Sequence, residues 1–162
     1  MPLTTAPCVI QTDLLMTGLA ATSKRQAFRA IAERTALMFG GDSDVLLTAL
    51  LERERIGTTG IGAGVAIPHV KVDGVNRVYG VLACLATPVD YDAIDGAPVD
   101  IVFMLLAPAD SKTTQHLKVL AQMSRFLRDP QVVAGLRATR DESVIATLIK
   151  NWITTQVQQL AC

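Results

Sequence analysis

The chain has 162 residues, half of them hydrophobic, with 15 basic side chains, 15 acidic side chains and 4% aromatic residues. This length suits a single domain with a real core, and no apolar run approaches the roughly 20 residues of a membrane-spanning helix. Balanced charge and few aromatics disfavour nucleic-acid binding, which needs basic surfaces that neutralise phosphates.

The N-terminal residues lack the basic start and the apolar core of a secretion signal. Three cysteines, odd in number and scattered, form no disulfide framework. We therefore expect a cytoplasmic protein without stable membrane insertion, whose partners are small molecules or other proteins.

The first half of the chain predicts two helices after a weakly patterned start. Residues 1–22 are expected to form an N-terminal arm or an edge strand, with Val9–Leu15 as the candidate strand. A helix should begin at Ser23, which forms a capping-box pattern with Gln26, and end at the glycine pair 40–41. Its apolar residues at helical spacing are Phe28, Ile31, Ala32 and Met38. A second helix should begin at Asp42 or Ser43, end at Gly57 and present one face made of Val45, Leu46, Ala49 and Leu50.

Two apolar runs, 78–86 and 99–107, are too continuous for half-exposed strands and predict central strands buried on both faces. The segment between them is rich in turn residues, and Asp92 and Asp95 are expected to form turns there.

The C-terminal part predicts three helices. The first should be capped by Asp110 or Ser111 and run over 112–127 until Asp129 and Pro130 break it; a short helix over 131–138 follows. The last should open on a second capping box, Thr139 with Glu142, and bury Val144, Ile145, Leu148, Ile149, Trp152 and Ile153. The prediction is one α/β domain, residues 23–153, with a C-terminal tail over 154–162.

The stretch GTTGIGAGVAIPHV, residues 57–70, contains four glycines in eight positions and one of only two histidines. A Walker A loop is excluded because no lysine and hydroxyl follow the glycines. A dinucleotide fingerprint is excluded because Ile67 occupies the third glycine position and Pro68 forbids a helix. The remaining interpretation is a bed of backbone amides that receives an anion beside His69.

Pro68 restricts the backbone around His69, so the imidazole is held in one direction. A rigid imidazole beside anion-binding amides suits a phosphoryl-accepting nucleophile, although a purely structural histidine fits the same pattern. His116, one turn inside its predicted helix, should be neutral because the positive end of the helix dipole disfavours protonation. It is either a hydrogen-bonding partner of the site or an ordinary helix-face histidine.

Three ordered motifs, RERIGTTGIGAGVAIPH, TPVDYDAIDGAPVDIVFMLLAPADS and HLKVL, resemble the type-2 enzyme IIA (EIIA) domain of the bacterial phosphotransferase system, the fructose/mannitol class. More narrowly, they resemble its nitrogen-regulatory branch (EIIA-Ntr). The resemblance covers roughly residues 26–149 and implies a mixed β-sheet sandwiched between helices.

The resemblance implies that His69 is the phosphorylated nucleophile and that His116 orients or hydrogen-bonds it. Arg53 matches an arginine near the site, and Thr59 with Gly60 matches a phosphoryl-binding position; a solvated arginine and a turn threonine are the plain alternatives. A shallow apolar depression for the incoming partner would be rimmed by Ile61, Val65 and Ile67, which could equally belong to the core.

By this resemblance the protein is a stoichiometric phosphocarrier and regulator. It would accept a phosphoryl group from a phosphohistidine on an HPr-like (NPr) carrier and signal through its phosphorylation state to targets such as a potassium transporter or a sensor kinase. No metal or cofactor is expected. The alternatives are a sugar-specific EIIA that passes phosphate to an enzyme IIB (EIIB), and a non-catalytic interaction module with the same fold.

Overall fold

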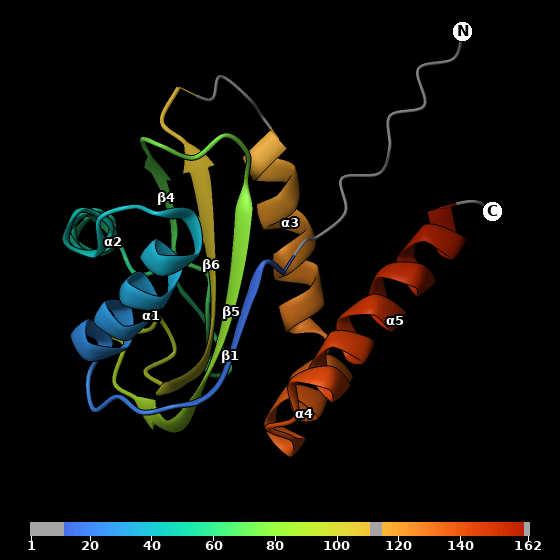
Figure 1. Ribbon diagram of the computed structural model, residues 1–162. Coiled ribbons are helices and arrows are strands. Elements are labelled where there is room, and N and C mark those ends of the chain that lie inside the picture. Colours follow the sequence, from blue (N-terminus) through green and yellow to red (C-terminus); the bar gives the residue numbers. More distant parts are fainter. Residues whose placement is uncertain (1–11, 111–114, 161–162) are drawn as a thin grey trace, which may run out of the picture. The chain divides into compact units, whose positions relative to one another are not determined.

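The computed structural model describes residues 12–110 and 115–160, which form two compact units (Figure 1). We call residues 12–110 the sheet unit and residues 115–160 the helical unit. The sheet unit contains β1 (Leu14–Leu19), α1 (Lys24–Phe39), α2 (Ser43–Ile56), β2 (Gly60–Gly62), β3 (Val65–Ala66), β4 (His69–Val72), β5 (Tyr79–Val89) and β6 (Val99–Pro108).

The six strands form one mixed sheet in the order β1-β5-β6-β3-β2, and β4 also pairs with β6. β5 and β6 are antiparallel, whereas β1 runs parallel to β5 and both β3 and β4 run parallel to β6. Nearly every side chain of β6 is buried. The predicted α/β class and the two central strands are therefore confirmed.

The edge strand β1 occupies Leu14–Leu19, later than the predicted strand, of which residues 9–11 lie outside the described part of the chain. Asp13 fixes its start, since its carboxylate accepts bonds from Arg77 Nη2 at 2.7 Å and from the Gly80 amide at 2.9 Å. Long-range polar contacts therefore set a boundary that the local pattern did not.

The predicted boundaries of α1 and α2 are confirmed. Ser23 caps α1 by accepting from the Gln26 amide at 3.1 Å, and Gly40 ends α1 in the left-handed conformation, φ 75°. Asp42 caps α2 by accepting from the Asp44 amide at 2.8 Å. The capping box is altered, however, because the Gln26 side chain accepts from the amide and hydroxyl of Thr22 rather than from Ser23.

α1 and α2 cover one face of the sheet (Figure 1). Two predicted positions are corrected, since Val45 is 61% exposed and Met38 is also exposed. The buried stripe of α2 instead continues through Leu47, because Leu47 lies about 60° from Leu50 around the helix axis, whereas Val45 lies about 140° from it. The largest buried side chains of this core are Phe28, Ile31, Leu46, Leu50, Tyr91, Met104 and Leu106.

The helical unit consists of α3 (Gln115–Arg128), α4 (Pro130–Ala138) and α5 (Glu142–Leu160). The predicted start of the first of these helices falls on residues 111–114, outside the described residues. Its predicted end is confirmed, because Asp129 caps α4 by accepting from the Gln131 amide at 3.0 Å and Pro130 takes the first helical position. Phe126 and Trp152 join α3 and α5 in an edge-to-face contact with centroids 5.2 Å apart.

The predicted capping box of α5 is wrong. Asp141 accepts from the Ser143 amide at 2.9 Å, and the Thr139 hydroxyl instead accepts from the Asp141 amide at 3.0 Å. The Ser143 hydroxyl and amide lower the pKa of Asp141, as expected for a carboxylate at a helix N-terminus. Val144 is half exposed, which corrects its predicted burial, and the segment assigned to a tail is helical as far as Leu160.

Candidate functional site

His69 is the first residue of β4, opposite Leu105 of β6, and its side chain is half-buried. Pro68 interrupts the ladder just before it, since proline has no N–H, but its carbonyl still accepts from the Leu105 amide at 2.9 Å. Nδ1 of His69 lies 3.2 Å from the Ile67 carbonyl oxygen. A carbonyl oxygen only accepts, so Nδ1 carries the hydrogen and Nε2 of the neutral ring carries the lone pair.

The turn before His69 is built from left-handed residues. Gly62, Ala63 and Gly64 have φ values of 98°, 57° and 82°, so β2 and β3 reverse direction within two residues. Asp95, from the β5–β6 connection, accepts from the Ala63 amide at 2.9 Å and from the Ala97 amide at 3.1 Å. These amides lower the pKa of Asp95, and the turn role predicted for it is confirmed.

Acceptors of the protein itself occupy four backbone amides in the stretch predicted to receive an anion. The Thr59 amide donates to Glu54 Oε1 at 3.0 Å, and the Gly60 amide donates to Thr58 Oγ1 at 3.1 Å. The Ala63 amide donates to Asp95, and the Ile67 amide donates to the Thr59 carbonyl at 3.0 Å. These four groups stiffen the turn and are not available to an incoming anion.

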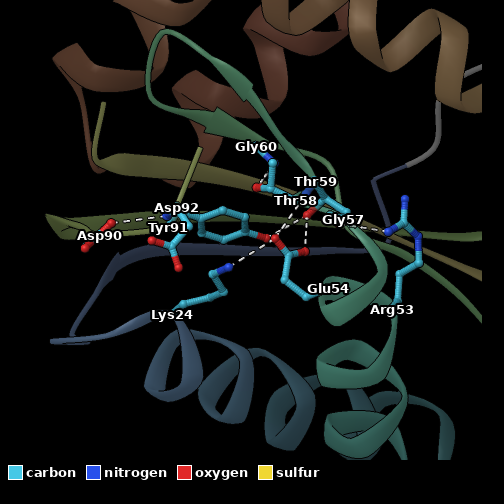
Figure 2. A network of polar contacts seen from close by, with 10 residues as sticks. All are labelled: Lys24, Arg53, Glu54, Gly57, Thr58, Thr59, Gly60, Asp90, Tyr91 and Asp92. Carbon is cyan, nitrogen blue, oxygen red and sulfur yellow. Dashed lines mark hydrogen bonds and ion pairs between the residues drawn. The ribbon is translucent and has the colours of Figure 1, made fainter. Parts of the chain in front are cut away.

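A largely buried polar network joins α1, the end of α2, the residues before this turn and the β5–β6 connection (Figure 2). Glu54, near the end of α2, has a side chain only 5% exposed and forms an ion pair with Lys24 Nζ at 3.2 Å. The Thr59 hydroxyl lies 2.7 Å from Glu54 Oε2 and 2.8 Å from the Tyr91 hydroxyl. Burial raises the pKa of Tyr91 well above its ordinary value, so this phenol is neutral. Lys24 also lies 4.6 Å from the centre of the Tyr91 ring.

Sequence reasoning missed Glu54 and Tyr91. Glu54 belongs to the alternating charged run Glu52-Arg53-Glu54-Arg55, which has the pattern of a solvated helix end. Tyr91 lies in a segment that reads only as turns. A tyrosine in such a segment was the one signal, because an aromatic ring needs somewhere to be buried.

Thr59 and Gly60 have structural contacts in place of the expected phosphoryl contacts. The Thr59 side chain is buried, and Glu54 and Tyr91 occupy its hydroxyl. Gly60 is buried against the β5–β6 connection, where an added Cβ would lie 2.9 Å from the Ala93 Cβ. Both residues therefore hold the turn against that connection.

Arg53 lies in the last turn of α2 and is half-buried. Its Nη1 donates to the Gly57 carbonyl at 3.0 Å, so it satisfies a carbonyl just beyond the helix end. A guanidinium has five N–H donors, so this contact is compatible with a second acceptor.

Two of the three predicted rim residues are corrected. Val65 and Ile67 are at most 3% exposed, because this stretch of chain lies between β2 and the central strand β6 and belongs to the core. Ile61 is half-buried. The exposed isoleucines of this unit are Ile56 and Ile94, at 84% and 85% exposure.

His116 is the second residue of α3, in the helical unit. Its Nδ1 is buried and has no hydrogen-bond partner among the described residues. A buried imidazole nitrogen without a partner is unusual and suits a ring that serves a further interaction. Its pairing with His69, which belongs to the sheet unit, stays a prediction.

The sequence matches the model of the protein family described as "Phosphoenolpyruvate-dependent sugar phosphotransferase system, EIIA 2" over residues 9–152. This match spans both units. The chain therefore belongs to this family and is a phosphocarrier or regulatory component of the phosphotransferase system.

Its relatives place it more narrowly. It is 38% identical over 149 residues to a nitrogen regulatory protein of Bradyrhizobium diazoefficiens, covering 92% of this chain and 95% of that protein. It is 40% identical over 128 residues to a nitrogen regulatory protein of Escherichia coli, covering 78% of each chain. The resemblance to the nitrogen-regulatory branch is thereby confirmed.

Solved structures agree. The crystal structure of nitrogen regulatory protein IIA-Ntr from Neisseria meningitidis matches with a TM-score of 0.77 and 27% identity, covering 84% of this chain and 92% of that one. The mannitol IIA of Escherichia coli matches with a TM-score of 0.71 in its complex with phosphorylated mannitol IIB, at 21% identity over 85% of this chain and 94% of that one. This second likeness shows the shared fold.

Within residues 12–110 and 115–160, no helix is long and apolar enough to cross a membrane. In the same ranges, no three His, Cys, Asp or Glu side chains gather in a group that could hold a metal ion.

Proposed function

We propose that this protein accepts a phosphoryl group on Nε2 of His69 from a phosphohistidine on an HPr-like (NPr) carrier. The observation that carries the proposal is the contact of Nδ1 with the Ile67 carbonyl oxygen, 3.2 Å away. This contact leaves the lone pair of the neutral ring on Nε2 and fixes the ring's direction, as a nucleophile requires.

In the transfer, the Nε2 lone pair of His69 forms a new P–N bond while the P–N bond of the donor histidine breaks and its electron pair returns to the donor ring. One phosphohistidine replaces another, so the step is close to balanced and reversible. We assign Arg53 of the sheet unit to bind the phosphoryl oxygens, because its guanidinium has N–H donors beyond the one that contacts Gly57. His116, whose Nδ1 lacks a partner among the described residues, is assigned to hydrogen-bond the site.

The regulatory role rests on the relatives named nitrogen regulatory proteins. A phosphoryl group adds a charge of about −2 to the surface at His69, which changes partner binding by repulsion or by new arginine pairing. We propose that the ratio of the two forms is read by target proteins, and that this exchange takes place in the cytoplasm, where an HPr-like donor would act.

Reconstitution tests the proposal. Purified protein is incubated with enzyme I, an HPr-like carrier and labelled phosphoenolpyruvate, and the label is followed on the wild type, His69→Ala and His116→Ala. We expect acid-labile label on the wild type, none on His69→Ala, and slower transfer with the label still on His69 in His116→Ala. Equal labelling of wild type and His69→Ala, or no labelling of either, contradicts the proposal and leaves an interaction module.

A second incubation separates regulation from sugar transport. The labelled protein is mixed with an EIIB domain of the mannitol type, because the mannitol IIA relative is solved in complex with phosphorylated mannitol IIB. We expect the label to stay on this protein. Rapid passage of the label to EIIB would instead identify a sugar-specific EIIA.

A further inference from the structure

A continuous series of polar contacts runs from α1 to the imidazole of His69, all within the sheet unit. Lys24 Nζ and the Thr59 amide both reach Glu54 Oε1, at 3.2 Å and 3.0 Å. The Thr59 carbonyl accepts from the Ile67 amide at 3.0 Å, and the Ile67 carbonyl faces Nδ1 of His69 at 3.2 Å. Figure 2 shows the first part of this series, from Lys24 to Thr59.

From these contacts we propose that Glu54 is a positioning residue for His69. Its buried carboxylate fixes Thr59, and the Thr59 carbonyl in turn holds the Ile67 amide, next to the Ile67 carbonyl that selects the tautomer of His69. This inference rests on the proposed role of His69 as phosphoryl acceptor, and it assigns a function to a residue outside the reacting groups.

The directions of the hydrogen bonds follow from the chemistry of the groups. An ionised carboxylate only accepts, so the Thr59 hydroxyl donates to Glu54 Oε2, and the Tyr91 hydroxyl must donate to Thr59 Oγ1. Glu54 therefore accepts from the amide and the hydroxyl of one residue, which holds Thr59 by both its backbone and its side chain. Bonds to a buried charged acceptor are stronger than neutral ones, so Thr59 has one well-defined position.

The Ile67 amide is held by the Thr59 carbonyl, and the next carbonyl along the chain, that of Pro68, is held by the Leu105 amide. The Ile67 carbonyl lies between these two contacts, so its direction depends on Thr59. The next residue, Pro68, has no N–H, and the strands on either side, β3 and β4, are two and four residues long. A shift of Thr59 therefore rotates the Ile67 carbonyl away from Nδ1 of His69. Without this acceptor the Nδ1–H tautomer loses its advantage, and the Nε2–H tautomer is populated as well. The fraction of rings with a lone pair on Nε2 falls accordingly.

The primary test is the tautomer of His69 in unphosphorylated protein, measured from imidazole ¹⁵N shifts at alkaline pH. We compare the wild type with Glu54→Gln, which removes the charge and one acceptor oxygen at similar size. Glu52→Gln is the matched control, since Glu52 lies on the same helix and is exposed. We expect the Nδ1–H tautomer to dominate in the wild type and in Glu52→Gln and to fall in Glu54→Gln.

The second readout is the rate of phosphoryl transfer from the HPr-like carrier. We expect a decrease of about tenfold in Glu54→Gln, because a small misplacement of the reacting atom is costly, and less than twofold in Glu52→Gln. A folded Glu54→Gln protein that keeps both the wild-type tautomer and a rate within twofold overturns the inference. An unaltered tautomer with a slower rate also overturns it, because the positioning route requires both to change.

Thr59→Val decides the question if Glu54→Gln does not fold. Valine has the shape of threonine but leaves Glu54 Oε2 without its donor, so the tautomer should shift in the same direction by a smaller amount. If the wild type never labels on His69, the proposed function fails while the tautomer comparison still decides whether Glu54 positions the ring. The two failures are therefore distinguishable.

Discussion

Two polar clusters hold the same turn against the same β5–β6 connection, one of them buried and the other exposed. The buried cluster joins Thr59 to Tyr91 and Glu54, and the exposed cluster joins Ala63 to Asp95. Their bond lengths are similar, from 2.7 to 2.9 Å. Water competes for Asp95 but not for Glu54, so similar geometry should give very different energies.

Removal of the buried carboxylate should have the largest effect. Glu54→Ala leaves the Thr59 amide and hydroxyl without their acceptor and Lys24 without its ion pair. We expect a decrease of about 3 kcal/mol in the free energy of unfolding, measured by urea denaturation. Glu52→Ala is the control and should change it by less than about 0.5 kcal/mol. Equal effects of the two variants would show that burial does not distinguish these glutamates.

Gly60→Ala should come next, because it tests the close approach between the turn and the connection. The added Cβ would lie 2.9 Å from the Ala93 Cβ and 3.3 Å from the Ala93 Cα, so the backbones must separate. We expect the free energy of unfolding to decrease by about 2 kcal/mol. The double variant Gly60→Ala with Ala93→Gly should be more stable than the sum of the single changes predicts. If the free-energy changes of the two single variants simply add up to that of the double variant, this contact is not the cause.

Tyr91→Phe should lower the free energy of unfolding by about 1 kcal/mol, which is less than either change above. The phenylalanine ring keeps the edge-to-face contact with Phe28, with centroids 5.8 Å apart, and Thr59 keeps its bond to Glu54. Only the donor to Thr59 Oγ1 is lost. Urea denaturation measures the difference, and a loss as large as that of Glu54→Ala would mean that the phenol, not the carboxylate, holds the network.

Asp95→Asn should have the smallest effect, and it should depend on pH. The amides of Ala63 and Ala97 lower the pKa of Asp95 below its ordinary value of 3.8, so its charged form stabilises the fold at neutral pH. That contribution is lost as the pH falls through 3.8 towards the lowered folded value. The free energies of unfolding of wild type and Asp95→Asn should therefore differ slightly at pH 7, and the difference should shrink as the pH falls below 3.8. Asp73→Asn, an exposed aspartate in another turn, is the control. A gap that widens on acidification would contradict this sign.

The sequence by itself determined the boundaries of α1 and α2, the break between α3 and α4, and the central strands. Ser23, Gly40, Asp42 and Asp129 act on backbone groups within a few residues, and such local contacts are visible in the order of residues. Continuous apolar runs likewise predict buried strands without knowledge of their neighbours. The family was also readable from the sequence, because its motifs lie in ordered stretches around His69 and His116.

Only the tertiary structure decided what surrounds His69. Thr59 and Tyr91 are 32 residues apart, as are Ala63 and Asp95, and no local pattern shows that these side chains meet. The same holds for Val65 and Ile67, whose burial depends on which strands lie beside them. Local propensity reflects contacts between residues a few positions apart, whereas burial and long-range hydrogen bonds depend on how the strands pair. The sequence could therefore single out His69 as the candidate histidine, but not the contacts that surround its ring.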